Sequence, residues 1–193
     1  MKRIISICLT VILILGFVAC SGEQASLETA SVLSNDLSSP MFSLDGVIYT
    51  LPVHFSELEA NGWRPYDPNN RFATDILEPD DFVTWELIAG DQNVGVTFTN
   101  LSEEVLPISE SYITVVSVFF EMHSAQLVLP GNIMLGSTYE DVIAAYGEPS
   151  SWHTSEDPPS LLMFHSSDDV TLQIVINTEG NLVTIMSMHY WDS

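Results

Sequence analysis

Basic side chains are scarce in this chain, which has 4 Lys and Arg against 26 Asp and Glu among its 193 residues. Lys2 and Arg3 stand at the start and every acidic residue follows Cys20, so the part after Cys20 holds 2 basic and 26 acidic residues, a formal charge of −24. Such a surface repels nucleic-acid phosphates and anionic headgroups, which argues against nucleic-acid binding. It favours solubility on a crowded surface, and it equally suits a cationic or calcium-bearing partner.

Cysteine is almost absent as well. Cys8 and Cys20 are the 2 cysteines, so the chain after residue 20 has no thiol for a disulfide, a metal or a nucleophile. The sequence also lacks a Gly-x-Ser-x-Gly elbow and a glycine-rich phosphate loop, and its 5 histidines fit no zinc spacing. We therefore expect no catalytic set, no metal and no cofactor. A hydrolase that uses two facing carboxylates stays open as the enzymatic alternative, since acids are abundant.

The first twenty residues have the layout of an export signal. Lys2 and Arg3 precede an apolar run over residues 4–17, and small residues lead to Cys20. The run is short for a membrane span, which needs about 20 apolar residues. The sequence Phe17-Val18-Ala19-Cys20 resembles the lipobox of bacterial lipoproteins, with Phe17 in place of the usual leucine. The resemblance implies a lipid on Cys20 and an anchor on the extracytoplasmic face of the cell membrane. Cleavage before Ser21 without a lipid is the alternative.

Residues 21–40 are rich in serine, alanine and acidic residues and contain no aromatic residue. This composition predicts a flexible tether, with the folded part beginning near Met41. Asp45-Gly46 between apolar runs predicts a type I′ hairpin. A short helix is expected over residues 54–61, with Phe55 and Leu58 buried. Strands are expected over residues 82–88, 94–99 and 112–120.

A second helix is predicted near residue 139. Ser137 and Glu140 have capping-box spacing, and Gly147 and Pro149 end the helical pattern. Its apolar stripe consists of Tyr139, Val142, Ile143 and Tyr146. Strands should follow over residues 161–165, 170–177 and 182–190. Glu140 and Asp141 lie in the first turn, where the helix dipole favours negative charge, and so have a structural explanation.

The two helices align at an offset of about 84 residues, which places Leu51 with Leu135, Phe55 with Tyr139 and Leu58 with Val142. We therefore predict an α+β fold of two divergent repeats, over residues 41–125 and 126–193. Each repeat is a short helical element followed by an antiparallel meander, and the strands form one continuous or paired sheet. Chance similarity between two amphipathic helices is the alternative.

The segment over residues 136–149 carries a Gly-x-Thr at the helix start and a Gly-x-Pro after the helix. It resembles the helix motif of the SmpA/OmlA outer-membrane assembly lipoproteins and the tandem units of β-lactamase inhibitory protein. The whole pattern is also similar to uncharacterised lipoproteins of Gram-positive bacteria. The resemblance implies a helix-on-sheet protein-binding module in which this motif is structural. The residues that carry it are Gly136, Ser137, Thr138, Tyr139, Val142, Ile143, Tyr146, Gly147 and Pro149.

The strand over residues 170–177 alternates, with Val170, Leu172, Ile174 and Ile176 on one face. If a turn pairs Asn177 with Leu182, the other face is mixed and methionine-rich, a composition that suits adaptable binding. This predicted docking face comprises Thr171, Gln173, Val175, Met186 and Met188. The sequence thus predicts a non-enzymatic, membrane-anchored envelope module with a protein partner. A structural spacer without a specific partner is a further alternative.

Overall fold

The computed structural model describes residues 33, 35–156 and 159–191. The predicted leader, Cys20 and most of the predicted tether lie outside these residues. Within the described part, no helix is both long and apolar enough to cross a membrane. The described chain is mostly antiparallel β-sheet with two short α-helices, which is compatible with the predicted α+β class.

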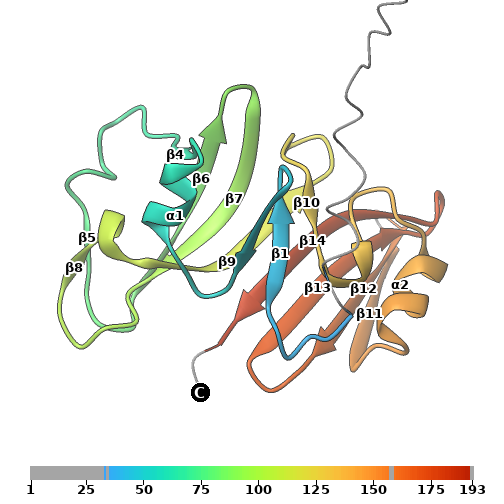
Figure 1. Cartoon of the computed structure of the whole chain (residues 1–193). Helices are drawn as coiled ribbons and strands as arrows, with labels where there is room; N and C mark the ends of the chain where they lie inside the picture. Colours follow the sequence, from blue (N-terminus) through green and yellow to red (C-terminus); the bar gives the residue numbers. More distant parts are fainter. Residues whose placement is uncertain (1–32, 34, 157–158, 192–193) are drawn as a thin grey trace, which may run out of the picture.

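The first half of the described chain contains one α-helix, one 3₁₀ helix and strands before and after them (Figure 1). Its elements are β1 (Met41–Leu44), β2 (Val47–Thr50), β3 (Val53–His54), α1 (Phe55–Ala60), β4 (Arg64–Pro65), β5 (Ile76–Leu77), β6 (Phe82–Ala89), β7 (Gln92–Thr99), β8 (Leu106–Pro107), the 3₁₀ helix η2 (Ile108–Glu110) and β9 (Tyr112–Phe119). Asp45 and Gly46 both have positive φ in the turn between β1 and β2, which confirms the predicted hairpin.

The second half also contains one α-helix with long strands after it. Its elements are β10 (Leu127–Val128), the 3₁₀ helix η3 (Pro130–Asn132), α2 (Tyr139–Tyr146), β11 (Ser151–Glu156), β12 (Pro159–Ser166), β13 (Val170–Asn177) and β14 (Leu182–Tyr190). The long predicted strands are confirmed to within two residues at each end. Strand β11 was not predicted, because its polar sequence carries no apolar alternation.

One large sheet connects the two halves. Its strand order is β11-β12-β13-β14-β9-β7-β6-β4, and β3 also pairs with β9. The strands after α1 therefore run from one edge to the centre, and the strands after α2 run from the opposite edge to the centre. The last long strands of the two halves, β9 and β14, pair antiparallel in the middle. Of the two predicted arrangements, one continuous sheet or paired sheets, the long strands adopt the continuous sheet.

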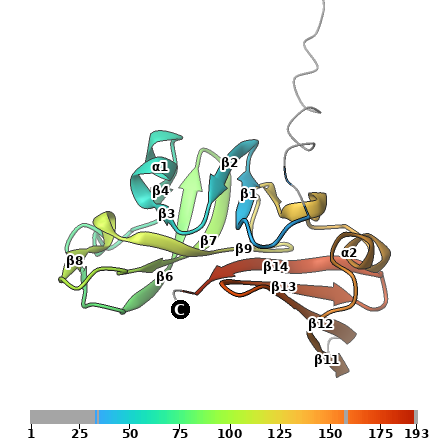
Figure 2. The ribbon, with the colours of Figure 1, turned by 60° about the horizontal axis from the view of Figure 1, so that its bottom comes forward.

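A covering layer lies on one face of this sheet. Figure 2 shows α1, the small sheet β10-β1-β2 and α2 on the same side, with β12 and β11 curving away from them. Strand β10 belongs by sequence to the second half but pairs with β1 of the first. One continuous hydrophobic cluster fills the space between the layers across both halves. Burying this apolar area is the main stabilising contribution to the fold.

An aromatic cluster anchors α1 to the sheet. The ring of Phe72 lies 5.3 Å from those of Phe55 and Phe98 and 5.5 Å from that of Trp85. Edge-to-face pairs of this kind stabilise a core beyond the area they bury. Phe72 belongs to the long loop before β5, for which the sequence shows no periodic pattern. Asp67 holds this loop by accepting hydrogen bonds from the backbone N–H groups of Arg71 and Phe72.

Helix α2 packs as its stripe predicts but begins differently. Val142 is fully buried, and Tyr139, Ile143 and Tyr146 pack against the core. The N-cap is Thr138, which forms a capping box with Asp141, so the predicted box of Ser137 with Glu140 is wrong. The Ser137 hydroxyl instead accepts a hydrogen bond from the Met134 N–H in the preceding turn.

The folded part begins before Met41. Leu33 is 5 % exposed, and Leu37 packs against the core. The Leu37 carbonyl also accepts a hydrogen bond from the Ser167 hydroxyl. The last residues of the predicted tether therefore lie against the domain. Their apolar side chains are spaced too widely in a polar segment to signal this packing in advance.

Candidate functional site

The second face of the large sheet carries no helix or strand among the residues that the structure describes, and we call it the outer face (Figure 2). Strand register aligns its side chains in three rows across the sheet. The first row is His153, Leu162, Val175, Ile185 and Phe119. The second row is Ser151, Phe164, Gln173, Ser187, Ser117, Gly95 and Glu86. The third row is Ser166, Thr171, His189, Val115, Thr97 and Thr84.

The outer face differs in charge from the rest of the chain. Its rows hold hydroxyl, amide, imidazole, aromatic and aliphatic groups, and Glu86 is the single acid in them. Acidic residues instead stand in the turns that border the rows, namely Asp80, Asp81, Glu103, Glu104, Glu121, Asp168, Asp169 and Glu179. Depletion of charge at the centre with a polar rim is the usual composition of a protein interface.

A turn limits the outer face at the end of β9. The His123 ring lies against Phe119, with ring centroids 5.3 Å apart, and its Nδ1 accepts a hydrogen bond from the Phe119 N–H. Gly95 lies beneath this turn, and a Cβ there would lie only 2.7 Å from the Ser117 hydroxyl oxygen, whereas it would make an ordinary contact of 3.5 Å with the His123 ring. Burial lowers the pKa of His123, while the nearby Glu86 carboxylate acts in the opposite direction. The turn that contains His123 therefore covers the outer face at the end of β9.

His189 is the titratable group at the middle of the third row. Its Nε2 lies 2.8 Å from the Ser187 hydroxyl, and its ring stacks on Trp191 at a centroid distance of 5.8 Å. Burial lowers the pKa of His189, which favours the neutral imidazole. The exposed Trp191 ring extends the apolar surface beside it.

The structure separates the predicted docking residues onto two faces. Thr171, Gln173 and Val175 lie on the outer face as predicted. Met186 and Met188 lie on the core face, where both side chains are fully buried, so their assignment to the docking face is wrong. The reason is a bulge in which Thr184 is unpaired between the pairs Ile176–Val183 and Val175–Ile185. One extra residue turns every following side chain of a strand to the opposite face.

Ser187 and His189 take the places that the two methionines were expected to occupy, opposite Gln173 and Thr171, and Ile185 lies opposite Val175 on the same face. Leu162 and Phe164 of β12 also belong to the face, and they were missed because residues 161–164 are a continuous apolar run without the alternation that separates two faces. The histidine spacings, which fit no metal site, predict ordinary surface or edge positions for these residues. His165 instead is 3 % exposed on the core face and packs on Tyr146. Burial lowers the pKa of His165 and raises that of Tyr146.

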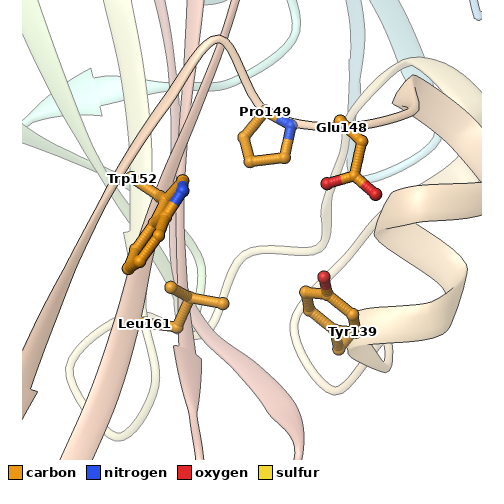
Figure 3. Close-up of a pocket in the computed structure, with 5 residues that line it drawn as sticks. All are labelled: Tyr139, Glu148, Pro149, Trp152 and Leu161. Carbon is orange, nitrogen blue, oxygen red and sulfur yellow. The ribbon is translucent and has the colours of Figure 1, made fainter.

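A second feature is a small groove at the edge of the core face (Figure 3). It has a volume of about 220 Å³ and is lined by Tyr139, Glu148, Pro149, Trp152 and Leu161. Tyr139 begins α2, Glu148 and Pro149 follow that helix, and Trp152 and Leu161 come from β11 and β12. Figure 3 shows the Glu148 carboxylate and the Tyr139 hydroxyl directed toward one another on the side of the groove that faces Trp152. The sequence identified Tyr139 and Pro149 only as structural residues.

Carboxylates of the described residues stay out of the core, where the buried polar side chains are serines, a threonine, an asparagine and His165. The resolved pKa shifts of carboxyl groups are downward, at Asp36 and Asp141, and hydrogen bonds cause both. The described residues also contain no cluster of three or more His, Cys, Asp or Glu side chains able to hold a metal.

Known proteins offer no guide to either surface. Comparisons of the chain with protein-family models, with curated proteins and with solved structures found no match. A function for this chain therefore has to be inferred from the geometry of the described residues.

Proposed function

We propose that this chain is a lipid-anchored extracytoplasmic module of the cell envelope that binds a protein partner through the outer face, without catalysis. The observation that carries the proposal is the outer face itself, a surface that spans the sheet from β11 to β6 and mixes apolar and neutral polar groups. The lipobox-like ending at Cys20 supports the anchor, and the predicted leader supports export.

The acidic turns that border the outer face indicate the kind of partner it would bind. Acidic turns surround the neutral rows, and the described residues include two cationic side chains, Arg64 and Arg71, of which Arg71 is paired with Asp75. A partner with an apolar centre and a basic border would complement this surface. Electrostatic complementarity of that kind increases the rate of association and selects the partner.

The proposal includes an internal duplication. Each helix is followed by four antiparallel strands that run from a sheet edge to the centre, β4-β6-β7-β9 in one half and β11-β12-β13-β14 in the other. Two aligned helix residues, Leu58 and Val142, are fully buried, and a glycine with positive φ follows each helix, Gly62 and Gly147. These correspondences support a divergent repeat, related by an approximate twofold between β9 and β14.

The test is recovery of a partner from envelope extract by the full chain in detergent. Wild type should retain a discrete protein that raised salt releases, because surface charge attraction is screened by salt. The variant Gln173→Arg places a bulky cation at the centre of the outer face and should abolish recovery. Gln126→Arg makes the same change at an exposed position in the turn before β10 and should leave recovery intact.

Thermal unfolding of both variants should match wild type, so that a loss of binding is not a loss of folding. Recovery of nothing above an unrelated acidic protein would count against a binding function. Equal recovery by both arginine variants would keep a partner but reject the outer face as its docking surface.

A further inference from the structure

Glu148 has no cation of the described chain to neutralise it. It is exposed beside β11, at one edge of the large sheet, whereas Arg64 lies in β4 at the opposite edge and Arg71 is paired with Asp75. The surrounding chain is strongly acidic, which concentrates cations near its surface. A counter-ion for this carboxylate must therefore come from solution or from a partner.

The groove beside Glu148 presents two aromatic rings with different burial. Trp152 is 60 % exposed, while Tyr139 packs partly against the core. In register, Trp152 pairs with Met163 of the core face, so the indole projects from β11 on the side of α2. Figure 3 shows the indole and the phenol on opposite sides of the groove, with Leu161 between them. Aromatic faces attract cations, most strongly those of tryptophan.

The size of the groove limits its ligand. Its volume of about 220 Å³ is below the range of about 300–1,000 Å³ that is typical of pockets for drug-sized molecules. A single long side chain fits this size better than a cofactor. Pro149, Leu161 and Trp152 offer apolar contact for an alkyl chain, and the Glu148 carboxylate and Tyr139 hydroxyl offer acceptors at the far side.

We propose that this groove binds a lysine side chain of a partner protein, with the alkyl stem along Trp152 and Leu161 and the ammonium between Glu148 and Tyr139. Lysine combines the apolar stem and the compact three-donor cation that this arrangement complements. The groove lies on the α2 side of the sheet and is separate from the outer face. Its ligand can therefore be tested whether or not the outer face docks a partner.

The experiment titrates the full chain in detergent with a short capped peptide that contains one lysine, and follows the indole N–H signals by NMR. The Trp152 signal is assigned by its loss in Trp152→Phe. Wild type should show a saturable shift of this signal. A peptide with acetylated lysine, which lacks the charge, should bind at least about tenfold more weakly, since hydrogen bonds between charged groups are the stronger ones.

Two matched pairs of variants locate the site. Glu148→Gln should weaken binding about tenfold, whereas Glu179→Gln, which removes an exposed carboxylate in the β13–β14 turn, should not. Trp152→Ala should weaken it about threefold or more, whereas Trp191→Ala, which removes the other strongly exposed indole, should not. Affinity in the tryptophan variants is read from the Tyr139 ring signals.

The outcomes separate recognition from general attraction to an acidic protein. Equal affinity for the lysine and acetyl-lysine peptides would overturn the proposal. Equal losses in Glu148→Gln and Glu179→Gln would overturn it as well, because they would show attraction to net charge alone.

Discussion

Met188 lies directly opposite Leu172 across β13 and β14, and both side chains are fully buried on the core face. The pair exists because Thr184 forms a bulge that shifts the register after Val183. Without this bulge, Met188 would lie opposite Thr171 on the outer face. The position of one unpaired residue thus decides whether the methionines of β14 stabilise the core or line a binding surface.

The first prediction tests this register. Met188→Ala should lower the free energy of unfolding by about 2–5 kcal/mol, because it removes a buried side chain and leaves a cavity. Gln173→Ala, on the outer face of the neighbouring strand, should cost far less, since surface substitutions usually change stability by under about 0.5 kcal/mol. Urea unfolding of the two variants measures the difference. Similar small losses in both would place Met188 on the surface and refute the bulge.

The second prediction concerns the start of α2. Thr138→Ala removes the side chain that caps the Asp141 N–H and should cost about 0.5–2 kcal/mol in urea unfolding. Thr138→Ser keeps the hydroxyl and serves as the control, with a loss well below that of the alanine variant. If alanine and serine are tolerated equally, the capping box does not contribute to stability.

The third prediction concerns acid. Burial lowers the pKa of His165 below its ordinary value of 6.5, so the unfolded state binds its proton more readily than the folded state. The stability contributed by the neutral imidazole is complete above about pH 6.5 and is lost as the pH falls toward the lowered pKa of the folded state. His123 and His189, whose pKa values burial also lowers, act in the same direction.

His165→Phe should therefore reduce the loss of stability between pH 7.5 and pH 5, because phenylalanine fills a similar space beside Tyr146 and cannot be protonated. Urea unfolding at the two pH values measures this difference, and His153→Phe, at an exposed position on β11, is the control. The same pH dependence in wild type and His165→Phe would show that His165 is protonated in the folded state as easily as in the unfolded state.

The fourth prediction concerns the anchor. Cys20→Ser should release the protein from membranes or block its maturation, because the sulfur that would carry the lipid is gone. Membrane fractionation and metabolic labelling with a fatty acid measure the effect, and Cys8→Ser, within the predicted leader, is the control. Labelling and membrane retention that persist in Cys20→Ser would exclude a lipid at this cysteine.

Local patterns were sufficient to predict the elements whose signal is short-range. Asp45-Gly46 predicted the hairpin, because a type I′ turn needs positive φ at two consecutive residues and Asp-Gly adopts this conformation readily. Phe55 with Leu58, and Val142 with its stripe, gave the buried faces of both helices, because a 3.6-residue period brings these positions to one side. The same signals predicted long antiparallel strands after each helix, but they left open whether these strands form one continuous sheet or paired sheets.

Tertiary structure alone decided what depends on contacts between distant residues. Strand β11 gains its partner from β12, and Leu37 packs against a core whose residues are far away in sequence. The bulge at Thr184 has no local signature, yet it moves Met186 and Met188 from a predicted surface into the core. The groove likewise depends on Tyr139, Glu148 and Trp152 meeting across three elements. The spacing of apolar residues in a sequence indicates which side chains share a face of a helix or strand. Only tertiary packing determines which of these faces is covered.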